Sequence, residues 1–486
     1  MDERRAVLRG PLLCPLGALL SVVMPGAGHW AIAARFRPAV TAAAVGNVVA
    51  MLWLGFIMRN VGGTADLAAV AASRPRFILT GLLLLALAAL RLWAALDVAW
   101  RSRPQSTRWV TVGAAVAVAA VTIAGVVPIA VAANYVRITD RAVGRVFSSH
   151  DAVTAQPGAI ATTTTIGGGT TIDPTDTTDT SSGTPELFAG VDRVNVLLLG
   201  GDAGPFRYSL RTDSIIVVSI DPKTGDTVMV SIPRNLQHLP FPPGTELAKH
   251  FPKGFDGLAN AVYPYVSVRP TLAGGGADAG AQADKQGIAQ LLGIPIQYYV
   301  LVDMAGFVNV IDALGGIDIN VVKRVPSAGN PERAKHKVPA FIEAGKQHMD
   351  GTLALDYARS RSGDSDYKRM GRQRCMLAAI ANAASPRALA TGLPSLLDAF
   401  GKSVETDLPR SKLDEMAKLI DRYTSAGGPA AVRTLHLAPP QIQPANWNPK
   451  KVRTLVADVL KRPVPVDPST AGSIPVGAIP LLTSEC

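Results

Sequence analysis

The stretch Arg211–Asn235, RTDSIIVVSIDPKTGDTVMVSIPRN, predicts two extended segments joined by a tight turn. Asp213–Ile220 and Thr227–Ile232 are rich in Val and Ile, as strands are, and they flank the turn-forming sequence Asp221–Asp226. An apolar run that precedes them, Val194–Gly200 (VNVLLLG), has the continuous hydrophobicity of a buried strand. These three segments therefore predict neighbouring strands of one sheet.

The chain after this stretch predicts a mixture of strands and helices. Further strands are expected at Tyr298–Val302 and Ile317–Val321, around a helix at Ala305–Leu314. Later helices are expected at Tyr367–Ala384, Leu393–Val404 and Lys412–Tyr423, whereas Ala273–Ala283 resembles a low-complexity insertion. Mixed elements of this kind predict an α/β or α+β layered domain.

The first 140 residues predict a membrane anchor. Residues 39–58, 77–100 and 109–135 are apolar segments of at least 20 residues, enough to span a hydrocarbon core of ~30 Å. Residues 12–33 are interrupted by Pro25 and Gly26, so they predict either a fourth span or a re-entrant segment. The distribution of arginines favours three spans, with the rest of the chain outside the cell. We therefore expect a multi-pass plasma-membrane protein with an extracytoplasmic domain.

Composition then divides the remainder of the chain. Residues 141–189 are rich in Thr and Gly, which predicts a flexible linker. Residues 190–460 form the expected catalytic domain, and residues 461–486 a C-terminal tail. The three cysteines, Cys14, Cys375 and Cys486, predict a fold held by its core, with a Cys375–Cys486 bridge as the less favoured alternative.

Polar side chains stand where the predicted strands begin and end. Asp202 follows the first strand, Arg211 and Asp213 open the second, and Arg234 closes the third. Arginine forks bind phosphate oxygens bidentately, and carboxylates are oxygen ligands for Mg²⁺. The formal net charge of +11 also suits a phosphorylated substrate, an anionic membrane or nucleic acid. The predicted side of the membrane excludes nucleic acid as a partner.

A second group of polar residues follows in the segment YARSRSGDSDYKRMGRQR. Arg359 and Arg361 alternate along it, and Asp366, Arg369 and Gln373 share one helix face at positions i, i+3 and i+7. Together with the strand-end residues, these side chains predict a site that binds a pyrophosphate and a divalent cation.

Four segments of the sequence together resemble the LytR-CpsA-Psr family: VNVLLLGGD, RTDSIIVVSIDPKTGDTVMVSIPRN, LLGIPIQYYVLVDMAGFVNVIDALGGIDI and LDYARSRSGDSDYKRMGRQR. The resemblance runs from about Val194 to Ala384, and more weakly through Val404–Leu460. It implies a three-layer α/β/α domain with a mixed central sheet. It also implies an extracytoplasmic phosphotransferase that moves a glycopolymer from a polyprenyl pyrophosphate carrier to peptidoglycan, with Mg²⁺ as cofactor and membrane lipid as a further partner.

The resemblance also implies a role for each polar residue. Asp202 and Asp213 would hold the metal. The expected catalytic residues are Arg211, Arg234, Arg359, Arg361, Asp366 and Arg369, and the expected substrate-binding residues are Asn260, Arg372 and Gln373. A solvated charged face explains Arg372 equally well. Asn235 stands where the family usually has Asp, which removes a negative charge from that position.

Two other functions use the same residues. A polyprenyl-pyrophosphate phosphatase would differ only in taking water as the acceptor. A non-enzymatic lipid- or wall-binding regulator would need the binding groups without transfer.

Overall fold

The computed structural model describes residues 154–158, 187–202, 210–328, 339–361, 365–384, 404–461 and 481–482, and single positions between 48 and 147. Contacts within the chain divide it into two units, Met1–Val143 and Gly144–Cys486. The sheets and the helices that cover them belong to the second unit. The predicted boundaries of anchor, linker, catalytic domain and tail stay predictions.

The prediction of a multi-pass location in the plasma membrane is contradicted. Within the described part of the chain, no helix is both long enough and apolar enough to cross a membrane. The expected spans at residues 39–58, 77–100 and 109–135 and the segment at residues 12–33 lie, apart from single positions, outside the described residues.

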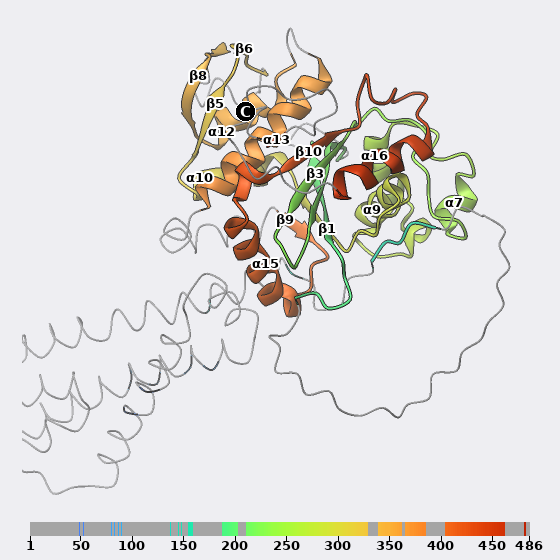
Figure 1. Cartoon of the computed structure of the whole chain (residues 1–486), viewed down its shortest axis with the longest axis horizontal. Helices are drawn as coiled ribbons and strands as arrows, with labels where there is room; N and C mark the ends of the chain where they lie inside the picture. Colours follow the sequence, from blue (N-terminus) through green and yellow to red (C-terminus); the bar gives the residue numbers. More distant parts are fainter. Residues whose placement is uncertain are drawn as a thin grey trace, which may run out of the picture. The chain divides into compact units, whose positions relative to one another are not determined.

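Six strands form the central sheet, in the order β10–β3–β2–β1–β4–β9 (Figure 1). Their bounds are β1 Val194–Gly201, β2 Thr212–Ile220, β3 Thr227–Ile232, β4 Tyr298–Val302, β9 Val404–Thr406 and β10 Arg433–His436. The pairs β1–β2, β2–β3 and β4–β9 are antiparallel, whereas β1–β4 and β3–β10 are parallel. The expected α/β fold with a mixed central sheet is therefore confirmed.

The turn between β2 and β3 has the predicted chemistry. The Asp221 carboxylate accepts hydrogen bonds from the backbone N–H groups of Lys223, at 2.7 Å, and Thr224, at 3.2 Å. Gly225 has a φ of 79°, a left-handed conformation that glycine adopts without a steric penalty. This hairpin fixes the register of β2 on β3 and so places the ends of both strands.

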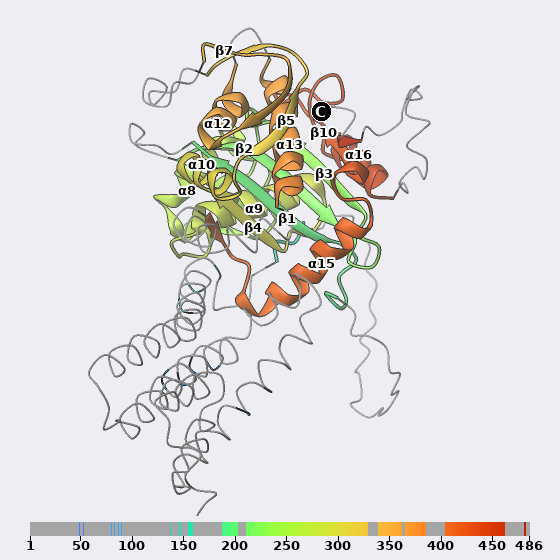
Figure 2. The same cartoon turned by 90° about the vertical axis from the view of Figure 1, so that its left-hand side faces the viewer.

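Helices cover both faces of the sheet (Figure 2). One face packs on α9 (Ala279–Leu292) and α16 (Pro449–Lys461), in a core that includes Leu197, Val217 and Ile288. On the other face, Ile216 and Met229 pack with Ala378 of α13 (Asp366–Ala383). The other helices described in the second unit are α7 (Glu246–His250), α8 (Val262–Ser267), α10 (Met304–Ala313), α12 (Gly351–Arg359) and α15 (Leu413–Ser425), with short 3-10 turns at Ala259–Ala261, Pro270–Ala273, Arg410–Lys412 and Gly428–Ala431.

A smaller unit with its own core stands beside the sheet. It has two two-stranded sheets, β5 (Ile317–Val321) with β8 (Gly345–Met349) and β6 (Val325–Pro326) with β7 (Phe341–Ile342). Ile319, Met349 and Met376 belong to its buried cluster, which joins these strands to α10, α12 and α13. The strand predicted at Ile317–Val321 therefore forms, although outside the central sheet.

Two expectations from the sequence are wrong, and the helix predicted at Leu393–Val404 is contradicted at its last residue. Ala273–Ala283 is no insertion, because α9 begins at Ala279 and its alanines Ala281 and Ala283 are at most 1% exposed. Val404 lies in strand β9, not at the end of a helix, and residues 393–403 lie outside the described residues. The favoured expectation of a fold without a disulfide is wrong, because Cys375 is buried and takes part in a disulfide. Cys14 and Cys486 lie outside the described residues.

Candidate active site

The central sheet brings three separate strand ends to one edge. β1 ends opposite the start of β2, where Gly201 pairs with Thr212. β3 ends beside the same part of β2, where Ile232 pairs with Ile215. Side chains that follow β1, open β2 and follow β3 therefore converge, as the sequence predicted.

Asp213 is the centre of this cluster. Arg234 Nη1 donates to both carboxylate oxygens of Asp213, at 2.9 and 3.0 Å. Asn260 Nδ2 donates to Oδ1 at 2.7 Å, and Arg361 Nη2 donates to Oδ2 at 3.1 Å. Arg361 comes from the segment after α12, almost 150 residues further along the chain, so tertiary folding assembles the cluster.

The electrostatics of Asp213 favour its ionised form. Burial raises the pKa of this carboxyl, but the hydrogen bonds from Asn260 and Arg234, together with the charges of Arg234 and Arg369, outweigh burial. The net pKa of Asp213 therefore lies below its usual value. For Arg234, burial lowers the pKa, and the contacts with Asp213 and Asp366 more than compensate, so its pKa is raised.

A second carboxylate, Asp366, links the arginines from the other side. It contacts Arg234 Nε at 3.3 Å and Arg369 Nη2 at 3.2 Å, and Arg361 Nε lies 3.8 Å away. Ser365 caps the helix by accepting a hydrogen bond from the Lys368 N–H, which sets Asp366 and Arg369 on consecutive turns of α13. Acidic and basic side chains therefore alternate in a connected network of hydrogen bonds and ion pairs.

Arg369 is the most buried arginine of this network. Its side chain is 3% exposed, and its Nη2 also donates to the backbone carbonyl of Asp213 at 3.1 Å. Burial lowers the pKa of Arg369, and the neighbouring Arg361 and Arg234 add to this effect. By contrast, the Arg361 side chain is 47% exposed, so it is the arginine with the most freedom to turn toward a ligand.

A cavity of about 520 Å³ begins at this cluster and extends along the sheet. Asp202, Asp213, Arg359, Arg361, Arg369 and Gln373 line it together with apolar residues. Leu198 and Ile216, which are paired three to four residues inward from the strand ends, belong to its wall. Val300, Phe307, Val310, Leu355, Met376 and Ile380 complete the apolar part from β4, α10, α12 and α13. The cavity is therefore charged at the strand ends and apolar toward its interior.

Two predicted site residues, Arg211 and Arg372, neither line this cavity nor join the Asp213 cluster through their side chains. The Arg211 side chain is exposed, but its backbone N–H donates to Asp202 Oδ1 at 2.7 Å and its carbonyl accepts from the Asp202 N–H at 3.0 Å. Arg372 is buried and donates from Nε to the carbonyl of Tyr357 at 3.2 Å, and from Nη2 to that of Ser360. The Arg211 backbone therefore positions Asp202, and Arg372 holds the carbonyls on either side of Ala358 and Arg359, which line the cavity.

One cavity residue was missed from the sequence. Asp303 directly follows β4, which runs parallel to β1, so it stands at the same edge as Asp202. Parallel strands bring their carboxyl ends together, and this rule could have identified it. Its carboxylate accepts from the Gly306 N–H at 2.6 Å and thereby caps α10.

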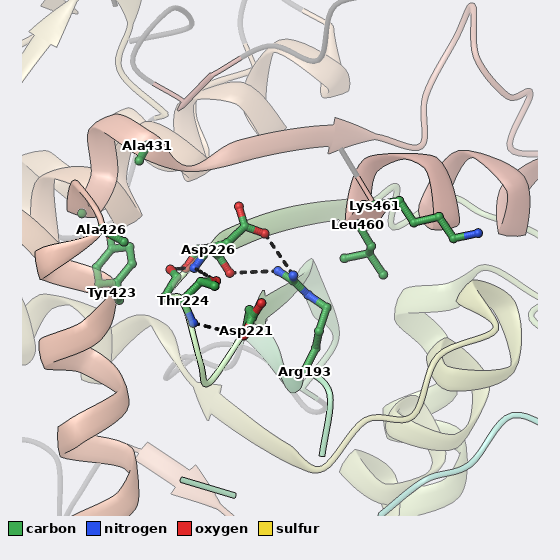
Figure 3. A pocket seen from close by; sticks show the side chains of 12 residues that line it. Arg193, Asp221, Thr224, Asp226, Tyr423, Ala426, Ala431, Leu460 and Lys461 are labelled. Atoms are coloured by element: carbon green, nitrogen blue, oxygen red, sulfur yellow. Dashed lines mark hydrogen bonds and ion pairs between the residues drawn. The ribbon is translucent and has the colours of Figure 1, made fainter. Parts of the chain in front are cut away.

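A different cavity, of about 380 Å³, lies at the opposite ends of the same strands (Figure 3). Figure 3 shows Arg193 and Asp226 joined across it, with an ion pair of 3.0 Å. Tyr423 and Lys461 also line it, but none of the predicted site residues does. Since the start of β1 and the turn between β2 and β3 form this end, it is separate from the Asp213 cluster.

Asp202 and Asp213 are the residues expected to hold Mg²⁺, and this role stays a prediction. The part of the chain that the structure describes contains no group of three or more His, Cys, Asp or Glu side chains arranged to hold a metal ion. Mg²⁺ commonly binds through one or two carboxylates completed by substrate phosphates and water. Asp202 and Asp213, which line the cavity beside Arg359, Arg361 and Arg369, fit this second arrangement.

Comparison with known families agrees with this geometry. The model of the LytR_cpsA_psr family matches residues 162–446, more than half of the chain. The chain belongs to the LytR-CpsA-Psr family. The matched region includes each aspartate and arginine of the cluster, so the resemblance predicted from four sequence segments is confirmed.

Curated relatives in this family are teichoic acid transferases. TagU of Oceanobacillus iheyensis, named polyisoprenyl-teichoic acid–peptidoglycan teichoic acid transferase, is 31% identical over 50% of this chain and 66% of its own length. TagU of Bacillus cereus is 30% identical over 49% of this chain and 68% of its own. The match to the first relative thus spans slightly less than two thirds of that protein. The crystal structure of TagV from B. subtilis is 25% identical, covers 55% of this chain and 96% of its own, and gives a TM-score of 0.41.

Proposed function

We propose that this LytR-CpsA-Psr protein is a phosphotransferase that moves a phosphate-linked glycopolymer from a polyprenyl pyrophosphate carrier onto peptidoglycan. The observation that carries the proposal is the cavity of about 520 Å³, which joins an apolar interior to a cluster of arginines and aspartates. The names of the TagU relatives, transferases that act on polyisoprenyl-linked teichoic acid and peptidoglycan, support the same chemistry.

The apolar interior suits a hydrocarbon chain. Its wall is made by aliphatic and thioether side chains such as Leu198, Val300 and Met376. Burying apolar surface contributes roughly 25 cal/mol per Å² of area removed from water. A polyprenyl tail that enters this cavity would therefore gain binding free energy with no polar group left unpaired.

The charged end suits a diphosphate. Arg359, Arg361 and Arg369 line it, and a guanidinium can donate two parallel hydrogen bonds to phosphate oxygens. Arg361 makes a single hydrogen bond to Asp213 and is half exposed, so it can exchange that contact for a phosphate. A Mg²⁺ ion held by Asp202 and Asp213 would neutralise charge on the phosphate oxygens.

The proposed reaction is an attack by an acceptor hydroxyl on the phosphorus nearest the glycan. The bridging P–O bond breaks, the acceptor hydroxyl passes its proton to the Asp366 carboxylate, and the polyprenyl monophosphate leaves. Negative charge on the bridging and leaving oxygens increases in the transition state, and the fixed arginines stabilise it without reorganisation. Asp366, which contacts Arg234 and Arg369, keeps both guanidinium groups in place.

Transfer of a labelled glycan tests this function. The full chain is incubated with Mg²⁺, a radiolabelled polyprenyl-pyrophosphate-linked glycan and purified peptidoglycan, and label in the peptidoglycan is counted. We expect transfer by the wild type and a loss of at least about 100-fold in Arg361→Ala. Arg324→Ala is the matched control, because Arg324 is exposed and pairs with Glu343.

Two results would replace the proposal with another function. Cleavage of the donor at the same rate with and without peptidoglycan, with no label transferred, would identify a phosphatase. Binding of donor without cleavage, under conditions in which a TagU relative transfers the label, would identify a lipid-binding regulator.

A further inference from the structure

A groove outside the Asp213 cluster is lined by aromatic, proline and lysine side chains. Its volume is about 610 Å³, and it lies between α7, the loop after it and the segment before α16. Six of its residues matter here: His238, Phe241, Lys249, Phe251, Lys253 and Trp447. Four prolines, Pro240, Pro243, Pro252 and Pro449, add flat, rigid walls. We call it the Trp447 groove.

The groove is physically joined to the active site by one short segment, Arg234–His238. Arg234 belongs to the Asp213 cluster, and His238 lines the groove. Four residues of chain span at most about 14 Å, so the two sites are close. The segment is held on both sides: the Asn260 N–H donates to the Arg234 carbonyl at 3.1 Å, and Trp447 Nε1 donates to the Gln237 carbonyl at 2.7 Å.

The lining combines aromatic surface with positive charge. Phe241 and Phe251 are buried beneath the groove, with ring centroids 5.9 Å apart, and Trp447 is half-buried at its side. Lys249 pairs with Glu246 at 2.6 Å, whereas Lys253 is exposed and has no acidic partner among the described residues. An occupant should therefore offer flat C–H-rich faces to the rings and an anionic group to Lys253.

We propose that the Trp447 groove binds the acceptor: a glycan strand that carries carboxylates. Sugar rings present C–H-rich faces that pack on indole and proline, and their hydroxyl groups stay in water. The lactyl carboxylate of a stem-free muramyl residue, or a carboxylate of its peptide stem where one is attached, would lie against Lys253. Since a glycan strand is a repeating polymer, it can occupy the groove while one of its hydroxyls reaches the phosphates at Arg234 and Arg361. The inference rests on the proposed transfer reaction and names where its acceptor binds.

Binding of soluble glycan probes tests the proposal independently of transfer. The probes are a GlcNAc–MurNAc oligosaccharide, which carries lactyl carboxylates, and a neutral GlcNAc oligosaccharide of equal length. Titration calorimetry with the full chain should show tighter binding of the charged probe, weakened by added salt. We expect Lys253→Glu and Trp447→Ala each to lose about tenfold in affinity for it. Lys346→Glu, an exposed lysine on β8, should bind like the wild type.

The binding test does not depend on Trp447→Ala alone, because Lys253→Glu changes the groove without removing a contact inside the protein. Trp447→Ala removes a hydrogen bond to the Gln237 carbonyl and could unfold the region, whereas Lys253 is exposed, so Lys253→Glu retains the fold. Equal affinity of wild type and Lys253→Glu for the charged probe overturns the proposal. So does equal affinity of the wild type for the charged and neutral probes.

The chain itself offers a competing occupant. Gly158 packs against Pro243 at the edge of the groove, and Asp173, Asp176 and Asp179 follow it in the sequence. If the charged probe binds only after these three aspartates are changed to asparagine, the acidic segment fills the groove and the proposal is overturned.

Donor cleavage in the absence of glycan separates this inference from the proposed function. Lys253→Glu should cleave the polyprenyl-pyrophosphate donor with water at the wild-type rate, while Arg361→Ala should not. A wild type that neither cleaves nor transfers the donor refutes the proposed function, and probe binding then still reports on the groove. A wild type that transfers label but binds no probe refutes only the groove.

Discussion

The two faces of the central sheet are built by alternate residues of the same strands, yet one is filled and the other is open. Leu197 belongs to the core on the α9 side and is 0% exposed. Leu198, the next residue, packs on the other side and lines the 520 Å³ cavity. Alternation places side chains on faces, but it does not determine whether the layer opposite will reach them.

The covering helices explain the difference. α9 carries alanines and glycines toward the core, so it approaches closely: a Cβ added at Gly287 would lie 2.6 Å from a Leu239 methyl carbon. On the other side, α10, α12 and α13 share a separate core with the small sheets, although α13 also packs on the central sheet through Ala378. Because these helices also pack in the core of the small sheets, they need not close tightly onto the central sheet, and a cavity remains between them.

The largest expected difference between the two faces of the sheet is in what their side chains contribute to the free energy of unfolding. Leu197→Ala removes fully packed methyl groups and should lower the free energy of unfolding by about 2–5 kcal/mol. Leu198→Ala removes atoms that already face a cavity and should cost about 1 kcal/mol or less. Urea unfolding of both variants measures the difference. Equal costs would mean that the cavity face is packed as tightly as the α9 face.

Catalysis should distinguish the charged end of the cavity from the rest. Arg369→Lys keeps a positive charge but loses the contact that reaches both Asp366 and the Asp213 carbonyl. We expect label transfer to fall by about 100-fold, or about 2.7 kcal/mol in the barrier, because one fixed donor is lost. Lys368→Arg, on the neighbouring position of α13, is the control. Retention of half the activity in Arg369→Lys would show that charge alone is sufficient.

Filling the cavity should impair binding of a long lipid. Ala358 lines the cavity, so Ala358→Leu should raise KM for a long-chain polyprenyl donor by about tenfold and leave a short-chain donor unaffected. Ala281→Leu on the packed face should instead lose about 1–3 kcal/mol of stability with no dependence on donor length. Kinetics with two donor lengths separate these outcomes. The same KM change for both donors would place the lipid elsewhere.

The smallest effect concerns the pH dependence of stability. Asp284 of α9 is buried, with Thr212 as a hydrogen-bond donor at 3.0 Å, and burial raises its pKa to about 8. Above pH ~4 the unfolded chain loses this proton while the folded chain keeps it, so the folded state is progressively disfavoured up to pH ~8. Between pH 6 and pH 7 the wild type should lose about 1 kcal/mol relative to Asp284→Asn. Urea unfolding measures this, and an equal difference in the free energy of unfolding between wild type and Asp284→Asn at both pH values would contradict it.

The sequence predicted the central elements of the fold better than their surroundings. β3, β4 and β5 have their expected bounds, because Val- and Ile-rich runs specify strands and turn residues limit them. α9 was missed, since a helix rich in Ala and Gly has no clear apolar stripe. The separate location of β5 could not be seen, because strand pattern alone does not identify the partner strand.

The site was predicted by residue type more reliably than by orientation. Asp213, Arg234, Arg361, Asp366 and Arg369 meet as expected. Arg372 is one turn beyond Arg369 on α13, yet it faces the end of α12 and donates hydrogen bonds to the backbone carbonyls of Tyr357 and Ser360. Which carbonyls need a donor depends on where α12 ends in space, and no local pattern contains that information.

Strand order in the sheet has a consequence for synthesis of the chain. The centre, β3–β2–β1, lies within residues 194–232, whereas the two edge strands, β9 and β10, begin only at residues 404 and 433. A nascent chain can thus pair its centre early but must wait some 200 residues for both edges. Until then, β3 and β4 expose unpaired backbone groups that invite association with other chains. Premature termination before residue 433 would leave β3, the strand that Arg234 follows, at an open edge.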